Sequence, residues 1–240
     1  MRCLAIIPAY NEGESVGDVI RAIQREMPDC SIVVVDDGSR DTTAAAARRA
    51  GAIVLQLPFN LGIGGAVQTG YRYAWINGYE IAIQVDADGQ HPPSEMSKVI
   101  QPILDGTADM ATGTRFRGVG DFESSAGRRV GIELFARLVS LIIRERVTDT
   151  TSGFRAVNRK GIALFSSDYP QDYPEVETTA LAHQHGLRLI EVPVEMLQRQ
   201  AGESSIRLGG SIYYVVKVTL ALLIGLFRAP LPLPVDGAEN

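Results

Sequence analysis

Short apolar segments alternate with helical patterns through the first half of the chain, and this alternation constrains the fold more than any other feature. Five apolar runs predict buried strands at Cys3–Ile7, Ser31–Val35, Ala52–Gln56, Ile81–Val85 and Met110–Thr114. Between the first two runs, apolar side chains recur with the spacing of one helix face, at Val16, Val19, Ile20, Ile23 and Met27. Such alternation is typical of a parallel sheet covered by helices on both faces, so we predict an α/β fold.

The second half of the chain follows this alternation less strictly. Two further strands are predicted at Ser152–Val157 and Leu187–Val194, with a helix around Val176–His185 between them. We expect one domain over residues 1–210, followed by a C-terminal apolar or amphipathic helix and a tail over residues 211–240. The longest uninterrupted apolar run of this last segment is about half the length of a membrane span. It is therefore expected either to lie at a membrane surface or to pack against the core.

The composition excludes several classes of protein. Of the 240 residues, 45% are hydrophobic, which is too apolar for a disordered chain, and the net charge of −5 argues against nucleic acid as a partner. Two cysteines make no disulfide framework and the N-terminus lacks a signal-peptide core, so we expect a cytoplasmic protein. The charge is uneven, because residues 115–160 carry a net +5. That basic segment fits an anionic partner, such as a phosphate or a membrane surface, or is a solvated helix face.

Polar residues gather where the predicted strands end. The first strand ends in Pro8-Ala-Tyr-Asn-Glu12, the second in Asp36-Asp-Gly-Ser39, the third before Asn60 and the fourth in Asp86-Ala-Asp-Gly-Gln90. Ligands of parallel sheets bind beyond the carboxyl ends of the strands. Four strands that deliver acidic or amide groups to one edge therefore predict a functional site there.

Asp86 and Asp88 are the candidates for a metal site. Residues two apart on a strand share a face, so the two carboxylates can converge, with Gln90 nearby. Hard oxygen donors of this kind suit Mg²⁺ or Mn²⁺. The alternative is that one of the aspartates caps the helix that begins at Pro92 and Pro93.

Two weaker patterns have less certain meanings. Gly62-Ile-Gly-Gly65 lacks the spacing of the known nucleotide-binding motifs, so it is either a phosphate-binding loop or a close approach of a helix to the sheet. His91, His183 and His185 are not spaced as a ligand cluster, and we assign them structural or surface roles.

Together these motifs resemble glycosyltransferase family 2, whose members are inverting enzymes with a GT-A fold. The resemblance runs from Ile6 to about Arg207 and also includes Asn60-Leu-Gly-Ile-Gly-Gly-Ala66 and Thr151-Ser-Gly-Phe-Arg155. Asp86-Ala-Asp-Gly-Gln-His-Pro-Pro93 looks most like the dolichol-phosphate mannose synthase branch, which moves a sugar from a nucleotide onto a polyprenyl phosphate. The resemblance implies a GT-A (Rossmann-like) mixed, mainly parallel sheet and a catalytic domain at residues 1–210.

The resemblance also implies a role for each motif residue. The nucleotide-sugar donor would be bound by Pro8, Tyr10, Glu12, Asp36, Asp37, Asp86, Ala87 and Arg199. The metal on its diphosphate, Mg²⁺ or Mn²⁺, would be held by Asp86, Asp88 and Gln90. The acceptor phosphate would meet Arg115, Arg128, Arg129, Ser152 and Arg207. The catalytic residues would be Asp88, Arg115 and Arg199. Where the branch has the loop Arg-x-x-Gly-x-Ser-Lys, this chain has Ser205 in place of the lysine, and Arg207 is a candidate substitute.

Three functions are compatible with these residues. The first is sugar transfer to a polyprenyl phosphate in cell-envelope glycan synthesis, at the cytoplasmic face of a membrane, with the membrane surface or a membrane protein as partner. It needs cations and no general base, because a phosphate monoester is largely dianionic at pH 7. The second is transfer to a sugar hydroxyl, which needs a carboxylate base such as Asp149, Glu175 or Glu177. The third, a non-catalytic sugar-nucleotide-binding protein, is disfavoured by the intact motif residues Asp86, Asp88, Gln90 and Arg199.

Overall fold

The structure is a computed structural model that describes residues 2–114, 140, 152–171, 174–197, 220 and 233–234. Within these residues the strands form one seven-stranded sheet in the order β3-β2-β1-β4-β6-β5-β7. The strands are β1 (Cys3–Ala9), β2 (Cys30–Asp36), β3 (Ile53–Gln56), β4 (Ile81–Gln84), β5 (Met110–Thr114), β6 (Arg155–Asn158) and β7 (Leu189–Pro193). Each predicted strand is present, with its ends shifted by a few residues at most.

The pairing of the strands is mixed but mainly parallel. β3, β2, β1 and β4 pair in parallel, as do β5 and β7. β6 lies between β4 and β5 and is antiparallel to both. The predicted fold class, an α/β protein with a mixed, mainly parallel sheet, is confirmed.

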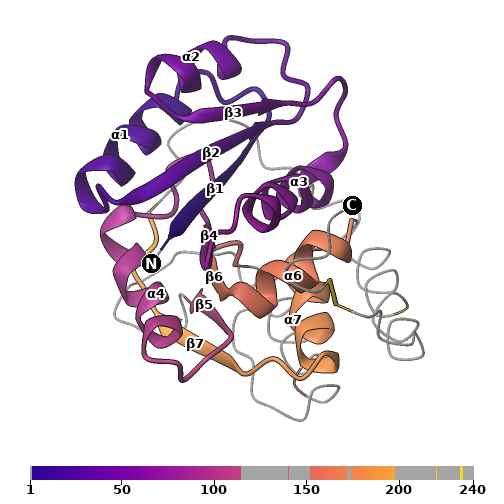
Figure 1. Ribbon diagram of the computed structural model, residues 1–240. Coiled ribbons are helices and arrows are strands. Elements are labelled where there is room, and N and C mark those ends of the chain that lie inside the picture. The colour runs from indigo at the N-terminus through magenta and orange to yellow at the C-terminus, as the bar shows by residue number, and fades with distance from the viewer. Residues whose placement is uncertain are drawn as a thin grey trace, which may run out of the picture.

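Helices cover both faces of the sheet (Figure 1). One face packs against α1 (Val16–Glu26), α2 (Thr43–Arg49), the short η1 (Pro93–Glu95) and α4 (Met96–Leu104), and the other against α3 (Gly62–Ile76), α6 (Arg159–Ser167) and α7 (Pro174–Gln184). Side chains of a strand alternate between the two faces. On β1, accordingly, Ala5 and Ile7 belong to the first core cluster, and Leu4 and Ile6 to the second.

The sequence pattern did not predict α6. A surface helix is recognised by apolar residues at every third or fourth position, but α6 is buried continuously from Gly161 to Ser166. The local signal that marks its start is Asn158, whose side-chain oxygen accepts hydrogen bonds from the backbone N–H groups of Lys160 (3.0 Å) and Gly161 (3.2 Å).

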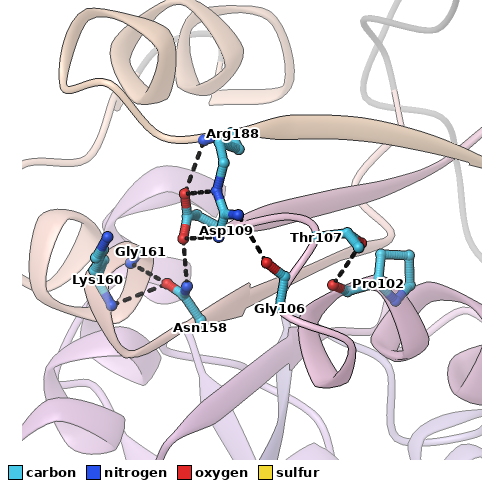
Figure 2. A network of polar contacts seen from close by, with 8 residues as sticks. All are labelled: Pro102, Gly106, Thr107, Asp109, Asn158, Lys160, Gly161 and Arg188. Carbon is cyan, nitrogen blue, oxygen red and sulfur yellow. Dashed lines mark hydrogen bonds and ion pairs between the residues drawn. The ribbon is translucent and has the colours of Figure 1, made fainter.

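A polar network joins β5, β6 and β7 where β5 and β7 begin, at the opposite end of these strands from their carboxyl ends (Figure 2). Asp109 accepts hydrogen bonds from Nε and Nη2 of Arg188, at 2.9 and 3.0 Å, and from Nδ2 of Asn158 at 2.7 Å. The hydrogen bonds of the Arg188 guanidinium lower the pKa of the Asp109 carboxyl well below its ordinary value. Since Asp109 precedes β5, Asn158 ends β6 and Arg188 precedes β7, the network fixes the relative positions of these strands.

The C-terminal segment 211–240 lies almost wholly outside the described residues, as does the basic stretch from Arg115 to Asp149 apart from Ser140. Within the described part of the chain, no helix reaches the length and hydropathy that a membrane span requires.

Candidate functional site

The carboxyl ends of the parallel strands bring the predicted polar residues to one edge of the sheet. In the registers of the central strands, Ala9 of β1 lies beside Asp36 of β2, and Ile6 lies beside Gln84 of β4. The loop 10–15, the turn 37–39 and the turn 85–91 therefore leave the sheet next to one another. The predicted convergence of these loops is confirmed.

The loops after β1 and β2 are held together by side-chain hydrogen bonds. The backbone N–H of Asn11 donates to Oγ of Ser39 (2.9 Å), and Oδ1 of Asn11 accepts from the N–H of Arg40 (2.9 Å). Asn11 has a positive φ of 55°, a conformation that asparagine tolerates better than most residues. Sequence reasoning did not single out this residue, and its position between Tyr10 and Glu12 was the only signal.

Among the predicted donor residues of this first loop, exposure differs widely. Pro8 is buried within β1, whereas Tyr10 is 44% exposed at the edge of the sheet. The backbone N–H of Glu12 donates to Oγ1 of Thr43 at 2.8 Å, and its carboxylate accepts from the hydroxyl of Ser15 at 3.0 Å. Tyr10 is thus the member of this group whose side chain is most accessible to a ligand.

Asp36 is a buried carboxylate, and one of its oxygens has no hydrogen-bond partner within the described part of the chain. Its side chain is only 1% exposed at the end of β2, and its Oδ1 accepts a hydrogen bond from the backbone N–H of Ser39 at 3.0 Å. No donor among the described residues reaches its Oδ2, which is also buried. A buried acceptor without a partner is costly, and such atoms are concentrated at functional sites.

Asp37 has a different environment from its neighbour. Its two carboxylate oxygens accept hydrogen bonds from the backbone N–H groups of Leu61 (2.7 Å) and Gly62 (2.9 Å), at the start of α3. Burial raises the pKa of this carboxyl, while the two backbone hydrogen bonds act in the opposite direction. Asp37 therefore connects the end of β2 to the N-terminus of α3 and has less capacity left for a ligand than Asp36.

The glycines of α3 serve close packing. A Cβ built on Gly64 would lie 2.4 Å from the carbonyl oxygen of Pro170, and one on Gly70 would lie 2.3 Å from Cγ2 of Ile6. Neither contact can be relieved without moving the helix. The close approach of the helix to the sheet therefore occurs at Gly70, whereas within Gly62–Gly65 it is Gly64 that packs closely, against the loop at Pro170.

Asp86 and Asp88 lie in the turn that follows β4 and not on the strand itself. β4 ends at Gln84, so the alternation of strand side chains does not relate the two carboxylates, and that part of our reasoning was wrong. The turn is shaped by a hydrogen bond from the N–H of Gln90 to Oδ1 of Asp88 (3.0 Å). The side chain of Asp86 is one third exposed (33%), whereas Asp88 is 6% exposed and Ala87 is 3% exposed.

His91 and Gly153 contact Asp86, and sequence reasoning did not connect either of them with this residue. Nδ1 of His91 accepts a hydrogen bond from the backbone N–H of Asp86 at 3.1 Å, and the ring is 4% exposed. A Cβ built on Gly153 would lie 3.2 Å from Oδ1 of Asp86. The signal for Gly153 was present in Thr151-Ser-Gly-Phe-Arg155, because a side chain here would crowd both Oδ1 of Asp86 and Nε2 of Gln84, which lies 2.8 Å from the same Cβ position.

The predicted acceptor residues are only partly described. Ser152 is 2% exposed, next in the chain to Gly153, and its Oγ accepts a hydrogen bond from the N–H of Phe154 at 3.3 Å. It therefore lies close to Asp86. The other predicted cations lie outside the described residues: Arg115, Arg128, Arg129, Arg199 and Arg207.

A buried arginine and a glutamate lie beside the acidic turn. Arg155 is 2% exposed, and its guanidinium donates to the backbone carbonyls of Pro174 (3.3 Å) and Glu175, at the start of α7. Burial raises the pKa of Glu175, the negative charge of Asp86 raises it further, and the charge of Arg155 lowers it. A carboxyl with a raised pKa near other charged groups is a candidate general base.

The turn 86–90 contains side-chain oxygens of the types that bind divalent cations. Among residues 2–114, 152–171 and 174–197, no group of three or more His, Cys, Asp and Glu side chains could hold a metal ion. Mg²⁺ and Mn²⁺ are commonly bound by one or two carboxylates together with substrate phosphates and water. Asp86, Asp88 and the amide of Gln90 are the residues that could hold such a cation.

Comparison with known proteins agrees with this architecture. The family model of glycosyl transferase family 2 matches residues 4–164. An uncharacterised protein of Methanocaldococcus jannaschii is 34% identical, over 91% of this chain and 90% of its own length. The polyprenol monophosphomannose synthase of Mycolicibacterium smegmatis (85% of this chain, 80% of its own) and the undecaprenyl-phosphate mannosyltransferase of Micrococcus luteus (91% and 93%) are each 30% identical.

Among solved structures, the glucosyl-3-phosphoglycerate synthase of Mycobacterium tuberculosis has the same fold. The structure solved in complex with Mn²⁺, UDP-glucose and phosphoglyceric acid superposes with a TM-score of 0.72 at 20% identity, covering 98% of this chain and 81% of the synthase. At this level of identity the likeness concerns the fold alone.

Proposed function

Because the chain belongs to glycosyltransferase family 2 and is a glycosyltransferase, we propose that it transfers a sugar, with inversion, from a nucleotide-sugar donor to a polyprenyl phosphate. One observation carries this proposal. The buried carboxylate of Asp36, whose Oδ2 accepts no hydrogen bond from the described residues, lies at the same edge of the sheet as the acidic turn 86–88. The names of the relatives from Mycolicibacterium smegmatis and Micrococcus luteus support the choice of acceptor.

The base of the donor would bind at Asp36. Its Oδ2 is a buried acceptor, which suits the N–H of a base such as uracil or guanine, with Tyr10 exposed nearby. Asp37, already bonded to the start of α3, would fix the loop that borders the nucleotide. Pro8 and Ala87 would provide the adjoining backbone and apolar surface, and Glu12 a further acceptor.

The diphosphate of the donor would lie over the turn 86–88, with Mg²⁺ or Mn²⁺ held by Asp86, Asp88 and Gln90. When bound, the cation would offset the negative charge that grows on the leaving diphosphate. Arg199, and Arg207 if it replaces the lysine of the related loop, would contribute positive charge to the same group. Closure of their loop over the donor would exclude water, which would otherwise hydrolyse the sugar nucleotide.

The acceptor phosphate would be bound by Arg115, Arg128, Arg129 and Ser152. The phosphate oxygen is anionic at pH 7 and attacks the anomeric carbon directly, so the protein must orient it and need not remove a proton. Arg155 is buried and Arg159 is bonded to backbone carbonyls, so the support for an anionic acceptor comes from residues 115–149, which carry seven basic and five acidic side chains. Ser152 precedes Gly153, whose backbone approaches Asp86, and this position is consistent with an acceptor phosphate that meets the donor there.

The decisive experiment is a panel of donors tested with polyprenyl phosphate. Purified protein is incubated with radiolabelled GDP-mannose, UDP-glucose or UDP-N-acetylglucosamine and either Mg²⁺ or Mn²⁺, and the organic phase is counted. We expect a labelled, acid-labile lipid product from one of these donors, and loss of transfer with EDTA. Transfer to a glycan or glycolipid, with none to polyprenyl phosphate, would overturn the assignment of the acceptor.

A second candidate function is transfer to a sugar hydroxyl, and the environment of Glu175 favours it. Its raised pKa would allow this carboxyl to accept a proton from the hydroxyl. Replacement of Glu175 by glutamine separates the two functions. A large loss of kcat that becomes smaller as the acceptor is made more acidic indicates a general base, whereas nearly full transfer to polyprenyl phosphate supports the first function.

The enzyme would work as a peripheral protein at the cytoplasmic face of a membrane, with residues 211–240 or the basic segment as the contact. Flotation with liposomes that contain anionic lipid tests this directly. The wild type is expected to float and Leu222→Glu to float less. Absence of binding by the wild type would contradict direct contact and leave a membrane-protein partner as the alternative.

A further inference from the structure

We propose that His91 is a positioning residue for the reaction: it fixes both the backbone and the carboxylate of Asp86 in the orientation that the donor diphosphate and its metal need. This inference rests on the proposed function, since it concerns the residue that would bind that group. It assigns a specific task to a side chain that the sequence pattern left with an undefined structural or surface role.

The first argument is the hydrogen bond between the two residues. Nδ1 of His91 accepts from the backbone N–H of Asp86 at 3.1 Å, which is possible only if Nδ1 carries no proton. In the neutral ring the proton is therefore assigned to Nε2. Nε2 lies 3.7 Å from Oδ2 of Asp86, so one imidazole contacts both ends of the same residue. The longer contact is electrostatic and is not a hydrogen bond.

The second argument is that the ring cannot move easily. His91 stacks on Phe154, with ring centroids 4.8 Å apart and an angle of 13° between the planes. Phe154 is completely buried, and His91 is 4% exposed. A ring packed in this way holds its nitrogens in one place, which a solvent-exposed histidine could not do.

The third argument is that Asp86 is restrained on its other side as well. Nε2 of Gln84 lies 3.4 Å from Oδ1 of Asp86, and the backbone of Gly153 passes close to the same oxygen. The carboxylate is enclosed by Gln84, Gly153 and His91, yet one third of the side chain remains exposed. The neighbouring residues therefore determine which part of the carboxylate is exposed, as expected for a group that binds a ligand in one orientation.

The expected effect follows from the behaviour of residues that orient metal ligands. Their replacement typically costs 10- to 100-fold in metal affinity or activity, because the ligand loses its fixed orientation while remaining present. A merely structural role would instead lower the stability of the turn and leave a folded variant with normal ligand binding. Binding and stability therefore have to be measured on the same variants.

Three variants test the proposal. His91→Phe keeps an aromatic ring that can stack on Phe154 but removes both nitrogens. His91→Asn keeps an acceptor near the position of Nδ1 and removes the group near Oδ2. His183→Phe, on α7, is the matched control because it changes a histidine outside the site. For each protein, thermal melting, the kcat and KM of transfer, and the affinity for Mn²⁺ with UDP or GDP by isothermal titration calorimetry are measured.

We expect His91→Phe to remain folded and to bind the Mn²⁺–nucleotide 10- to 100-fold more weakly, with a corresponding loss in kcat/KM. His91→Asn is expected to recover much of this loss, and His183→Phe to match the wild type. Should His91→Phe fail to fold, His91→Asn alone decides, because it should then bind the Mn²⁺–nucleotide more weakly than the wild type at an unchanged melting temperature. Wild-type binding in folded His91 variants would overturn the role of His91 and leave the proposed function standing. A wild type that binds neither nucleotide would overturn both.

Discussion

At the scale of single residues, two adjacent aspartates show that the role of a side chain depends on its local environment. Asp36 and Asp37 are both aspartates, but Asp36 ends a buried strand and no described residue bonds to its Oδ2, whereas Asp37 has left the strand and bonds to the start of α3. Because the strand ends between them, the two side chains have different surroundings, and neighbours of the same type can have unrelated roles. The motif could be recognised from the sequence, but the different roles of its two aspartates could not be predicted.

At Asp36 we predict a specific loss of donor binding. Asp36→Asn keeps one oxygen that can accept the N–H of Ser39. The amide group then replaces Oδ2, so its N–H faces the N–H of the base and no hydrogen bond can form. We expect the KM for the donor to rise about 10- to 100-fold, as for the loss of a hydrogen bond to a charged group. Steady-state kinetics measure this, and an unchanged KM would place the base elsewhere.

We predict that replacement of Asp88 abolishes sugar transfer and that replacement of Asp149 does not. Asp88→Asn removes a charged oxygen donor from the turn that we propose binds the metal, and it should abolish measurable transfer, because the charge on the leaving diphosphate is then less well offset. Asp149→Asn should keep substantial turnover, since a phosphate acceptor needs no base. Transfer assays on both variants provide the comparison. Equal losses would contradict the phosphate acceptor.

At the scale of secondary-structure elements, the start of α3 is stabilised by Asp37, a residue in the turn after β2. The residue before its first turn is Leu61, whose side chain cannot cap the helix, and Asn60 and Asp37 accept the N–H of Gly62 in its place. Helix starts are recognised in sequences by a capping side chain at the preceding position. A cap supplied by Asp37, in the turn after β2, leaves no signal at the preceding position, and Asn60, two residues before Gly62, is the local part of this cap.

Replacement of Asp37 should therefore destabilise the fold through α3. We expect Asp37→Ala to lower the free energy of unfolding by about 1–2 kcal/mol, the usual effect of losing a helix cap. Asp18→Ala is a suitable control, because Asp18 is 74% exposed and its ion pair with Arg21 should contribute less than about 1 kcal/mol. Urea denaturation of both variants provides the measurement, and equal stabilities would argue against the capping role.

At the scale of the whole molecule, the two edges of the sheet serve different purposes. The carboxyl edge has the acidic turn and the buried Asp36, whereas Asp109, Asn158 and Arg188 form a closed network at the opposite edge of β5 and β7 (Figure 2). The network satisfies its own charges, so it should stabilise the fold without taking part in the reaction.

This network predicts a pH-dependent contribution to stability. The pKa of Asp109 is lowered in the folded protein, so its stabilisation is fully present above the ordinary value of 3.8 and decreases as the pH falls through the folded value. Since Arg188 is half exposed, we expect Asp109→Asn to cost about 1.5 kcal/mol at pH 7. Urea denaturation at pH 7 and pH 3 should show a smaller difference from the wild type at the lower pH, with kcat at pH 7 unchanged.

The sequence by itself determined the strands, most of the helices, the convergence of polar loops at one edge and membership of the family. These depend on local periodicity and on the rule that parallel strands end at a common edge. Only the tertiary structure decided that β6 runs antiparallel between β4 and β5, that Gly153 meets Asp86, and that His91 stacks on Phe154. Those contacts join residues far apart in the chain, and their energies depend on packing that no local pattern encodes.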